Sequence, residues 1–313
     1  MDKPNLIMMN KPNLIMLCGL PGSGKSTYAL ELAENDNTVT HSSDAIRKEL
    51  GVSGGDRSQN EKVFSELHKR IKDDLRNGVN VVYDACNIHY KKRMAFLKEI
   101  DSIECCKKCV ILAVSYGRCL INNIRRESCV PEDVITRMYK SWTTPYYFEG
   151  WDDISIKYGT QHYHEPVIFI LDNQDFCQDN AHHSLTLGGH CAVAASYLSC
   201  AYPSRHDLIR TAMLHDCGKP FTKSFKHSNG ETTDEACYYN HQNVGAHDSL
   251  FYKANSIDEK IYSSVLIQFH MHPYFWEQKG SNTEKQRSKY KKLWGEEMYD
   301  DIIALHEADL VAH

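Results

Sequence analysis

A glycine-rich loop near the start of the chain restricts the possible folds more than any other feature. The stretch GLPGSGKST, Gly19–Thr27, matches the pattern G-x-x-x-x-G-K-[ST] in full. It follows the apolar run LIMLC and precedes a stretch typical of a helix, which is the context that this pattern requires. In such a loop, backbone N–H groups converge on a phosphate at the N-terminus of the helix. The loop therefore predicts an α/β fold.

Apolar and amphipathic segments alternate through the first half of the chain. The segments VNVVYDACN and CVILAVSY predict buried strands, and segments such as VFSELHKRIKDDLRNG predict helices between the strands. Strands that alternate with helices indicate right-handed parallel crossovers, and hence a doubly wound sheet covered on both faces. Ligands of such sheets bind beyond the carboxyl ends of the strands, which is where Gly19, Asp44 and Asp84 fall.

The character of the sequence changes after PVIFILDNQ. Polar residues replace the apolar pattern between Asp172 and Asn180, and from about Ala181 the chain is helical in pattern and rich in histidine. At 313 residues the chain also exceeds the usual size of a single core. We therefore predict an α/β doubly wound P-loop domain over residues 1–171, followed by an all-α domain over residues 172–313.

A short duplication precedes the glycine-rich loop. KPNLIM occurs at residues 3–8 and again at residues 11–16. Only the second copy leads into the loop and is expected to form the first strand, so the first copy is interpreted as an extension.

Composition argues against several classes of protein. No run approaches the roughly 18 apolar residues of a membrane span, and cleavage of a signal peptide after LIMLCGL would destroy the loop. Most of the 12 cysteines sit singly among apolar residues, which indicates a reducing compartment. The net charge of −5 argues against a surface coated with charge for nucleic acid. We therefore expect a cytoplasmic protein without a membrane partner.

The chemistry of the loop predicts that it binds ATP and Mg²⁺. Lys25 would reach the β- and γ-phosphate oxygens, and Ser26 would ligate the magnesium ion. The predicted nucleotide-binding residues are Gly19, Gly22, Ser23, Gly24, Lys25, Ser26 and Thr27. A loop of this kind alone does not distinguish an ATPase from a kinase.

The stretch SSDAIRKEL favours a kinase. It places a carboxylate and a guanidinium together after the second strand: Asp44 would accept the proton of an attacking hydroxyl, and Arg47 would bind a phosphate of the acceptor. The alternative is a helix N-cap at Ser43 or Asp44 with an exposed Arg47.

Four segments together resemble the kinase domain of phage-type polynucleotide 5′-kinases over roughly residues 12–165. They are GLPGSGKST, SSDAIR, YDACNIHYKKR and NNIRRESCVPEDVITRMYKS, in the same order and at similar spacing. The resemblance implies that Asp44 is the general base and that Arg47 holds the 3′-phosphate of the acceptor. It further implies that Arg126, in preference to Arg125, stabilises the transferring γ-phosphoryl group. The implied acceptor-side residues are Asp84, Asn87 and Arg93, although the lysines beside Arg93 indicate a solvated helix face.

The second half of the chain contains five segments rich in histidine and aspartate. They are TLGGHCAVAA, TAMLHDCGKPF, YYNHQNVGAHDS, LIQFHMHPYF and ALHEADLVAH. Adjacent His215 and Asp216 share a direction only at a helical kink or around a common ion, and Gly218 would permit a close approach of another segment. Imidazole and carboxylate ligands suit zinc, iron, manganese or nickel, and such a site generates a hydroxide for phosphoester hydrolysis.

These segments resemble the HD phosphohydrolase superfamily from roughly His182 onward. The resemblance implies one or two divalent transition-metal ions, with Lys219 near the scissile phosphate. The implied ligands are His190, His215, Asp216 and Asp309, joined by His241 and His270 as in two-metal members. The other histidines of this half, His182, His183, His247 and His272, are interpreted as core or surface residues.

Together the resemblances imply a bifunctional enzyme that heals broken nucleic-acid ends. It would combine an ATP-dependent 5′-OH polynucleotide kinase with a metal-dependent 2′,3′-phosphatase or phosphodiesterase. The implied substrates are 5′-OH and 2′,3′-cyclic-phosphate ends, of RNA rather than DNA, and the implied partner is a ligase. Bacterial end-healing enzymes that join these modules place the HD module first, whereas this chain has the reverse order.

Two alternatives remain open from the sequence. One is a kinase of a nucleoside or other small molecule joined to an HD nucleotide phosphohydrolase. The other is an ATP-gated binding or regulatory protein whose HD module senses a nucleotide. The sequence predicts no oligomeric state.

Overall fold

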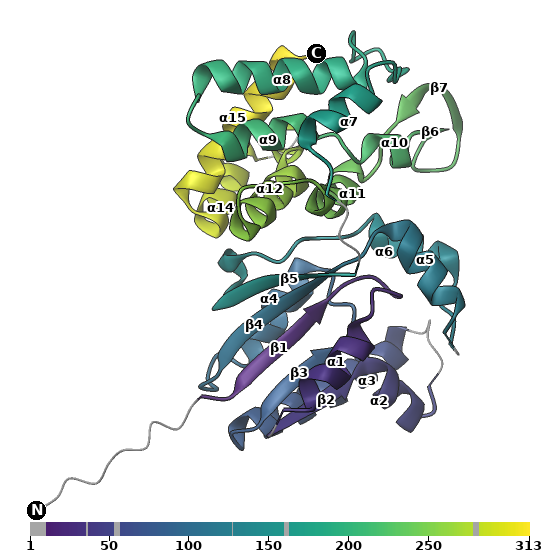
Figure 1. The fold of residues 1–313 in the computed structure, drawn as a ribbon, viewed down its shortest axis with the longest axis vertical. Helices are drawn as coiled ribbons and strands as arrows, with labels where there is room; N and C mark the ends of the chain where they lie inside the picture. The colour runs from purple at the N-terminus through teal and green to yellow at the C-terminus, as the bar shows by residue number, and fades with distance from the viewer. Residues whose placement is uncertain (1–10, 36, 53–56, 127, 160–162, 278–281) are drawn as a thin grey trace, which may run out of the picture.

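The computed structural model describes residues 11–35, 37–52, 57–126, 128–159, 163–277 and 282–313. An α/β part is formed by the first half of the chain and a mainly helical part by the second half, and the two lie one above the other in Figure 1. The first KPNLIM copy lies outside the described residues. None of the helices in the described part of the chain is long and apolar enough to cross a membrane.

A parallel sheet forms the centre of the α/β part, in the order β2-β3-β1-β4-β5. Its strands are β1 (Asn13–Cys18), β2 (Thr38–Ser42), β3 (Asn80–Asp84), β4 (Cys106–Ala113) and β5 (Asp153–Tyr158). The helices between them are α1 (Lys25–Ala33), α2 (Ser43–Glu49), α3 (Arg57–Arg76), α4 (Tyr90–Glu99), α5 (Tyr116–Ile124) and α6 (Glu132–Tyr139). The prediction of a parallel α/β fold is confirmed.

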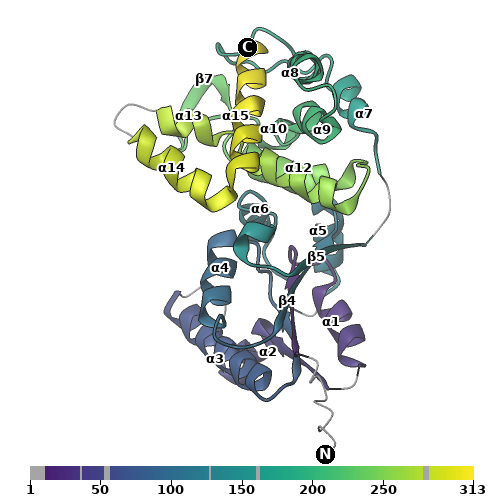
Figure 2. The ribbon, with the colours of Figure 1, turned by 90° about the vertical axis from the view of Figure 1, so that its left-hand side faces the viewer.

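Both faces of the sheet are apolar because both are covered by helices. Along β1, Leu17 packs with Ala29 of α1 on one face, whereas Leu14 and Met16 pack with Val63 of α3 on the other. Figure 2 shows α1 on one side of the sheet, with α3 and α4 on the opposite side. A strand buried on both faces gives the continuous apolar run seen in the sequence, rather than an alternating one.

Two elements near the middle of the chain differ from the expectation. The edge strand β5 was not predicted, because charged residues flank its isoleucines Ile154 and Ile156. The stretch PVIFILDNQ, assigned by prediction to the first domain, contains the short helix α7 (Pro166–Asp172). Helix α7 packs against α8 and α9 and thus lies with the helical part.

Helices make up most of the second half of the chain. They are α8 (Leu187–Ala201), α9 (His206–Leu214), α10 (Lys219–Thr222), α11 (His241–Asp248), α12 (Ile257–Phe269), α13 (His272–Glu277), α14 (Thr283–Trp294) and α15 (Glu296–Val311). Short 3₁₀ turns lie at η1 (Tyr147–Glu149) and η2 (Ser249–Phe251).

The second half of the chain was predicted to be all-α, but the structure contains strands there as well. An antiparallel hairpin, β6 (Ser224–Lys226) and β7 (Thr232–Cys237), follows α10. Its turn contains Asn229 and Gly230, and Gly230 adopts φ 89°, a conformation that favours glycine. The asparagine–glycine pair between two short strands is the sequence signal for this hairpin.

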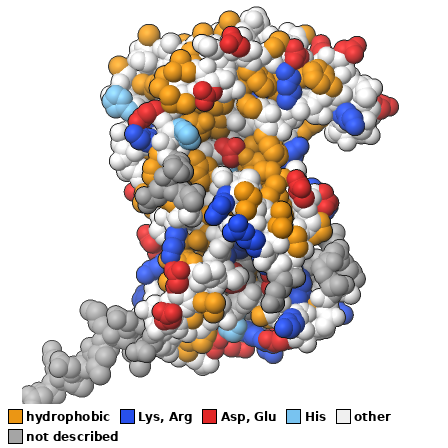
Figure 3. Space-filling model, turned by 45° about the vertical axis from the view of Figure 1, so that its right-hand side comes forward, with side chains coloured by type: hydrophobic (Ala, Val, Ile, Leu, Met, Phe, Trp, Pro, Cys, Tyr) orange, Lys and Arg blue, Asp and Glu red, His pale blue; other side chains and the backbone are white. Residues whose placement is uncertain are grey.

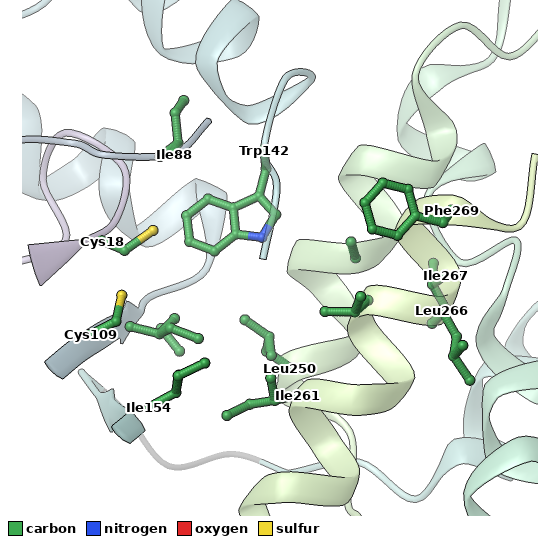
Figure 4. Close-up of a cluster of buried hydrophobic side chains, with 14 of the residues drawn as sticks. Cys18, Ile88, Cys109, Trp142, Ile154, Leu250, Ile261, Leu266, Ile267 and Phe269 are labelled. Atoms are coloured by element: carbon green, nitrogen blue, oxygen red, sulfur yellow. The ribbon is translucent and has the colours of Figure 1, made fainter. Parts of the chain in front are cut away.

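One hydrophobic core runs through both parts of the molecule. Trp142, which is fully buried, lies at its centre, between Cys18 and Ile88 of the α/β part and Leu250 and Phe269 of the helical part (Figure 4). A continuous core of this kind joins the two parts more firmly than a polar contact surface would.

Residues Trp142–Thr144, here called the connector, also join the parts by buried hydrogen bonds. Thr143 donates from its backbone and its hydroxyl to the carbonyl of Ile88, at 2.9 Å and 2.7 Å. Thr144 donates its N–H to Gln268 Oε1 at 2.7 Å, and its hydroxyl lies 2.6 Å from that of Ser264. The carbonyl of Trp142 accepts from Asn243 at 2.7 Å. The connector thus bonds to the loop after β3 and to helices α11 and α12.

We expect Trp142→Ala to lower the free energy of unfolding by about 3–5 kcal/mol, because it removes a buried ring and leaves a cavity. Tyr202→Ala is the control, since Tyr202 is 41% exposed at the end of α8 and its loss should change stability by less than about 0.5 kcal/mol. Urea unfolding followed by circular dichroism measures both. Equal stability of Trp142→Ala and the wild type would contradict the shared core.

Candidate functional sites

The glycine-rich loop joins β1 to α1 and is held in place by α5. Gly22 adopts φ 82°, and a Cβ there would lie 2.2 Å from the carbonyl oxygen of Cys119. Asn122 of α5 donates to the carbonyl of Gly22 at 2.9 Å. Glycine is therefore required at this position both by the backbone conformation and by the close approach of α5.

Lys25 and Ser26 begin α1 and point to different partners. The ammonium group of Lys25, which is buried, donates to the carbonyl of Leu20 at 2.8 Å. The hydroxyl of Ser26 donates to Asp84 Oδ2 at 2.9 Å. Asp84 reaches it because it ends β3 and pairs in register with Leu17 near the end of the neighbouring strand β1.

The pair Ser26–Asp84 fits a magnesium ion. A hydroxyl and a buried carboxylate side by side are hard oxygen donors of the kind that Mg²⁺ prefers. The sequence predicted Asp84 on the acceptor side of the site, whereas the structure places it against Ser26.

A cavity of about 250 Å³ lies beside the loop. Its wall includes Ser23, Gly24 and Thr27, all of which were predicted to bind the nucleotide. The other residues that line it are Tyr28, Glu31, Leu112, Val114, Arg118, Asn122, Lys157, Tyr158 and Gly159.

Asp44 lies between two arginines from different parts of the sequence. Its carboxylate accepts from Arg47 at 3.0 Å and from Arg126 at 3.3 Å. The N-cap of α2 is Ser42, which accepts from the N–H of Asp44, so the alternative N-cap at Ser43 or Asp44 is wrong. The side chain of Asp44 is 63% exposed, and exposed ion pairs are weak, so this carboxylate can exchange partners at little cost. Arg125 is exposed beside Arg126.

Asn87 and Arg93 hold the backbone after β3. Asn87 adopts φ 48°, and its side chain donates to the carbonyl of Leu17 at 2.9 Å. Arg93 donates to the carbonyl of Asn87 at 2.7 Å and to both carboxylate oxygens of Glu149 at 2.7 Å. Burial disfavours the charge of Arg93, but Glu149 outweighs burial and raises the pKa of Arg93 above its usual range.

The structure corrects the expectation for Arg93. The lysines beside it indicated a solvated helix face, and it was a candidate contact for the acceptor, but its side chain is 1% exposed. Both edges of its guanidinium group are occupied by Glu149 and the Asn87 carbonyl, so Arg93 positions the loop after β3 instead of facing the solvent.

The six histidine and aspartate residues that were predicted as metal ligands lie in one buried cluster. Asp216 is at its centre: its Oδ2 lies 3.3 Å from Nε2 of both His190 and His215. Its other oxygen, Oδ1, lies 3.3 Å from His241 Nε2 and 3.9 Å from His270 Nε2. Two groups within the cluster are each compact enough to hold an ion, namely His190, His215 and Asp309, and Asp216, His241 and His270.

The histidines of this cluster are oriented by backbone carbonyls. The Nδ1 atoms of His215, His241 and His270 lie 2.6–2.8 Å from the carbonyl oxygens of the residues three positions earlier. Nδ1 of His190 lies 3.1 Å from the carbonyl of Ala312. Because a carbonyl only accepts, each Nδ1 donates its proton, and each Nε2 is left to face the centre of the cluster.

The electrostatics of the cluster favour a cation. Burial works against the charge of Asp216, but Lys219 and His215 outweigh burial and hold its pKa well below the usual range. Burial and then His241 lower the pKa of His270 to about 3, so this ring is neutral. Burial also disfavours a charge on His190, but Asp216 and Asp309 outweigh burial and raise the pKa of His190 to about 9, so His190 has to release a proton when it binds a metal. The donor set of imidazole and carboxylate groups fits a divalent transition metal.

Gly218 brings the two halves of the cluster together. A Cβ at this position would lie 2.1 Å from the carbonyl oxygen of His241, so the predicted close approach is confirmed. The next residue, Lys219, donates to Asp216 Oδ2 at 2.7 Å and to Gln178 Oε1 at 2.8 Å. Lys219 is buried beside the cluster, and its place near a scissile phosphate stays a prediction.

Sequence reasoning missed several residues around the cluster. His183, interpreted as a core or surface residue, accepts from Lys219 at 3.1 Å and lies with His190 and His313 in a third compact group. Tyr274 donates to Asp309 Oδ2 at 3.1 Å. Asp309 and His313 are four residues apart, a spacing that places two side chains on the same face of a helix, so the sequence held a signal for His313. Nothing in the spacing pointed to His183 or Tyr274.

Comparison with known proteins found a family match in the first half of the chain. Residues 14–145 match the AAA domain family. Over 150 residues the chain is 29% identical to L-seryl-tRNA(Sec) kinase of Methanococcus maripaludis. The aligned region covers 46% of this chain and 58% of that protein. The α/β part has a P-loop fold, with a parallel sheet and the glycine-rich loop between β1 and α1. The chain spans little more than half the length of this curated relative.

The solved structures similar to this chain match weakly. One is the structure of the Pnkp1/Rnl/Hen1 RNA repair complex, at 20% identity and a TM-score of 0.38, with 45% of this chain and 46% of that chain covered. Another is a gluconokinase from Sinorhizobium meliloti 1021, at 16% identity and a TM-score of 0.36, with 49% and 85% covered.

We expect Glu149→Gln to destabilise the protein by about 3–5 kcal/mol, because it leaves the Arg93 charge buried without a partner. The double variant Arg93→Met/Glu149→Leu should recover most of this loss, because it removes both charges. Asp133→Asn is the control, because it breaks the exposed pair Arg137–Asp133 and should cost at most about 1 kcal/mol. Urea unfolding measures the stability of all three variants. A Glu149→Gln protein as stable as the Asp133→Asn control would refute the stabilising role of the buried Arg93–Glu149 pair.

Proposed function

We propose that the protein is a bifunctional enzyme that heals nucleic-acid ends. Its P-loop part would act as an ATP-dependent 5′-OH polynucleotide kinase, and its helical part as an HD-type metal-dependent 2′,3′-phosphatase or phosphodiesterase. We place the boundary between the two activities between β5 and α7, earlier than the predicted boundary at Asp172, because α7 packs against α8 and α9. The observation that carries the proposal is the presence of both a kinase-type acid–arginine group and an oriented histidine–aspartate cluster.

The kinase step uses residues at the carboxyl ends of β1, β2 and β3. Ser26 and Asp84 would hold the magnesium ion, which neutralises charge on the β- and γ-phosphates of ATP. Asp44 would accept the proton of the 5′-hydroxyl while the hydroxyl oxygen bonds to the γ-phosphorus. The bond between the γ-phosphorus and the bridging oxygen of the β-phosphate breaks in the same step, and ADP leaves. Arg126 would stabilise the transferring group, and Arg47 would bind the acceptor's 3′-phosphate. Both arginines can exchange partners in this way because their ion pairs with the exposed Asp44 are weak.

We propose an RNA-linked hydroxyl as the acceptor, and one relative supports this choice. The relative from Methanococcus maripaludis is named as a kinase of L-seryl-tRNA(Sec), an RNA-linked acceptor. Transfer to RNA ends is therefore preferred to transfer to DNA, and a ligase that joins the healed ends is the proposed partner.

The phosphohydrolase step would use the cluster around Asp216. His190, His215 and Asp309 would hold one ion, and His241 and His270 a second, with the Asp216 carboxylate between them. A metal centre of this kind supplies a hydroxide at neutral pH. Lys219, which lies 2.7 Å from Asp216, would neutralise charge on the phosphate of the substrate.

We expect Asp44→Ala to lower the rate of labelled γ-phosphate transfer from ATP to a 5′-OH RNA oligonucleotide by about 10²- to 10⁴-fold, because it removes the base. Arg126→Ala should lower the rate by at least about 10³-fold. Arg125→Ala, its exposed neighbour, and Asp216→Ala are the controls and should transfer label at the wild-type rate. If the wild type consumes ATP and labels only a nucleoside, the acceptor is a small molecule. If it binds ATP without transfer to either acceptor, a regulatory role is correct.

We expect the metal-loaded wild type to open and dephosphorylate a 2′,3′-cyclic-phosphate RNA end. Asp216→Ala should lose both metal content and hydrolysis, because its carboxylate faces both groups of candidate ligands. His182→Ala is the control, since His182 is exposed and should keep full metal content. Elemental analysis measures the metal and gel mobility the RNA product. Full metal content in Asp216→Ala, or a loaded wild type without hydrolysis, would contradict this half of the proposal.

A further inference from the structure

Aromatic rings and lysines alternate along the surface around α10. Lys140 Nζ lies 5.7 Å from the ring centre of Phe221. Lys223 Nζ lies 4.6 Å from the ring of Phe176 and 5.9 Å from the ring of Phe225. Phe221 is 40% exposed and Phe225 46% exposed, so part of each ring faces the solvent. These five residues are here called the α10 strip.

The α10 strip lies between the two candidate sites. Phe221 packs edge to face on Tyr116 at 5.1 Å and on Tyr139 at 4.9 Å, so it contacts both α5 and α6 of the kinase part. Helix α5 also holds the glycine-rich loop through Asn122. At its other end, α10 begins with Lys219, which bonds to Asp216. Figure 3 shows hydrophobic side chains gathered in the hollow between the two parts, with Lys and Arg beside them.

This combination suits a single-stranded nucleic acid. Exposed aromatic faces stack on unpaired bases, and lysines beside them meet the phosphates. In a duplex the faces of the bases are already stacked on one another and cannot reach such rings. The exposed acids Asp234 and Glu235 on β7 repel phosphate, so β7 is not part of the strip.

The charge of the strip is only partly free. Lys223 also bonds to Asp179 at 2.6 Å, which offsets its charge. Stacking should therefore carry more of the binding than phosphate contacts do, and the salt dependence should be shallow.

We propose that the α10 strip binds the single-stranded stretch of nucleic acid next to the end being healed. The inference rests on the proposed function for the identity of the substrate. Binding is nevertheless measurable without turnover, so the two ideas can fail separately.

The test is binding of a fluorescent single-stranded 5′-OH RNA oligonucleotide to the full chain, followed by anisotropy without ATP or metal. Phe221→Ala and Phe225→Ala should each raise Kd by about 5- to 150-fold, the range for loss of one stacked base. Lys140→Ala should make the slope of log K against log salt shallower by about 0.7. Phe275→Ala is the matched control, because Phe275 on α13 is also 46% exposed, and it should bind as the wild type does.

The outcomes separate the possibilities. If the wild type labels the oligonucleotide but both phenylalanine variants bind it normally, the strip inference is wrong and the proposed kinase stands. If the wild type binds the oligonucleotide through the strip but transfers no phosphate, the strip is correct and the kinase proposal fails. Equal affinity for a duplex of the same sequence would overturn the inference. The inference would also be wrong if the phenylalanine variants bound RNA normally but no longer self-associated, because the strip would then be a protein interface. Phe225 lies on the exposed hairpin, so its variant remains informative if Phe221→Ala fails to fold.

Discussion

The hydrogen bonds of the connector fix backbone segments that belong to both candidate sites, the glycine-rich-loop site and the histidine–aspartate cluster. Thr143 fixes the carbonyl of Ile88, one residue after Asn87, and so sets the loop that leaves β3. Thr144 fixes Gln268, two residues before His270 at the end of α12. Asn243, bound to the carbonyl of Trp142, is two residues after His241 at the start of α11. A displacement of the connector would therefore move the loop after β3 together with His241 and His270, which gives the two candidate sites a physical route for coupling.

The sequence predicted those parts of the structure that depend on local patterns. The strand, glycine-rich loop and helix are contiguous, so Lys25 and Ser26 were placed correctly on the P-loop, and the apolar strands predicted a parallel sheet. The partners of buried charges were out of reach, because they come from distant segments: Arg93 and Glu149 are 56 residues apart, and Lys219 and Gln178 are 41 apart. The position of Asp84 against Ser26 follows from the pairing of β1 with β3, which periodicity does not give.

The histidine cluster combines local and tertiary control. Three of its rings donate to the carbonyl three residues earlier, at Ala212, Tyr238 and Ile267, so the turn of chain around each histidine sets its tautomer. His190 instead donates to Ala312, beyond the end of α15, and its orientation depends on the packing of α15 against α8. The ring most dependent on long-range packing is thus the one whose Nε2 lies 3.0 Å from Asp309, also on α15.

Gly218 gives the cluster an uneven tolerance of sequence change. Any side chain there would collide with the carbonyl of His241 and push α11 away from α10. His241 would then leave Asp216, whereas His190, His215 and Asp309 lie on other helices and would keep their places. One nucleotide change in the codon for this glycine thus suffices to remove His241 from the six-residue cluster. The candidate metal group of Asp216, His241 and His270 would then be incomplete, although every histidine and aspartate of the cluster is still encoded.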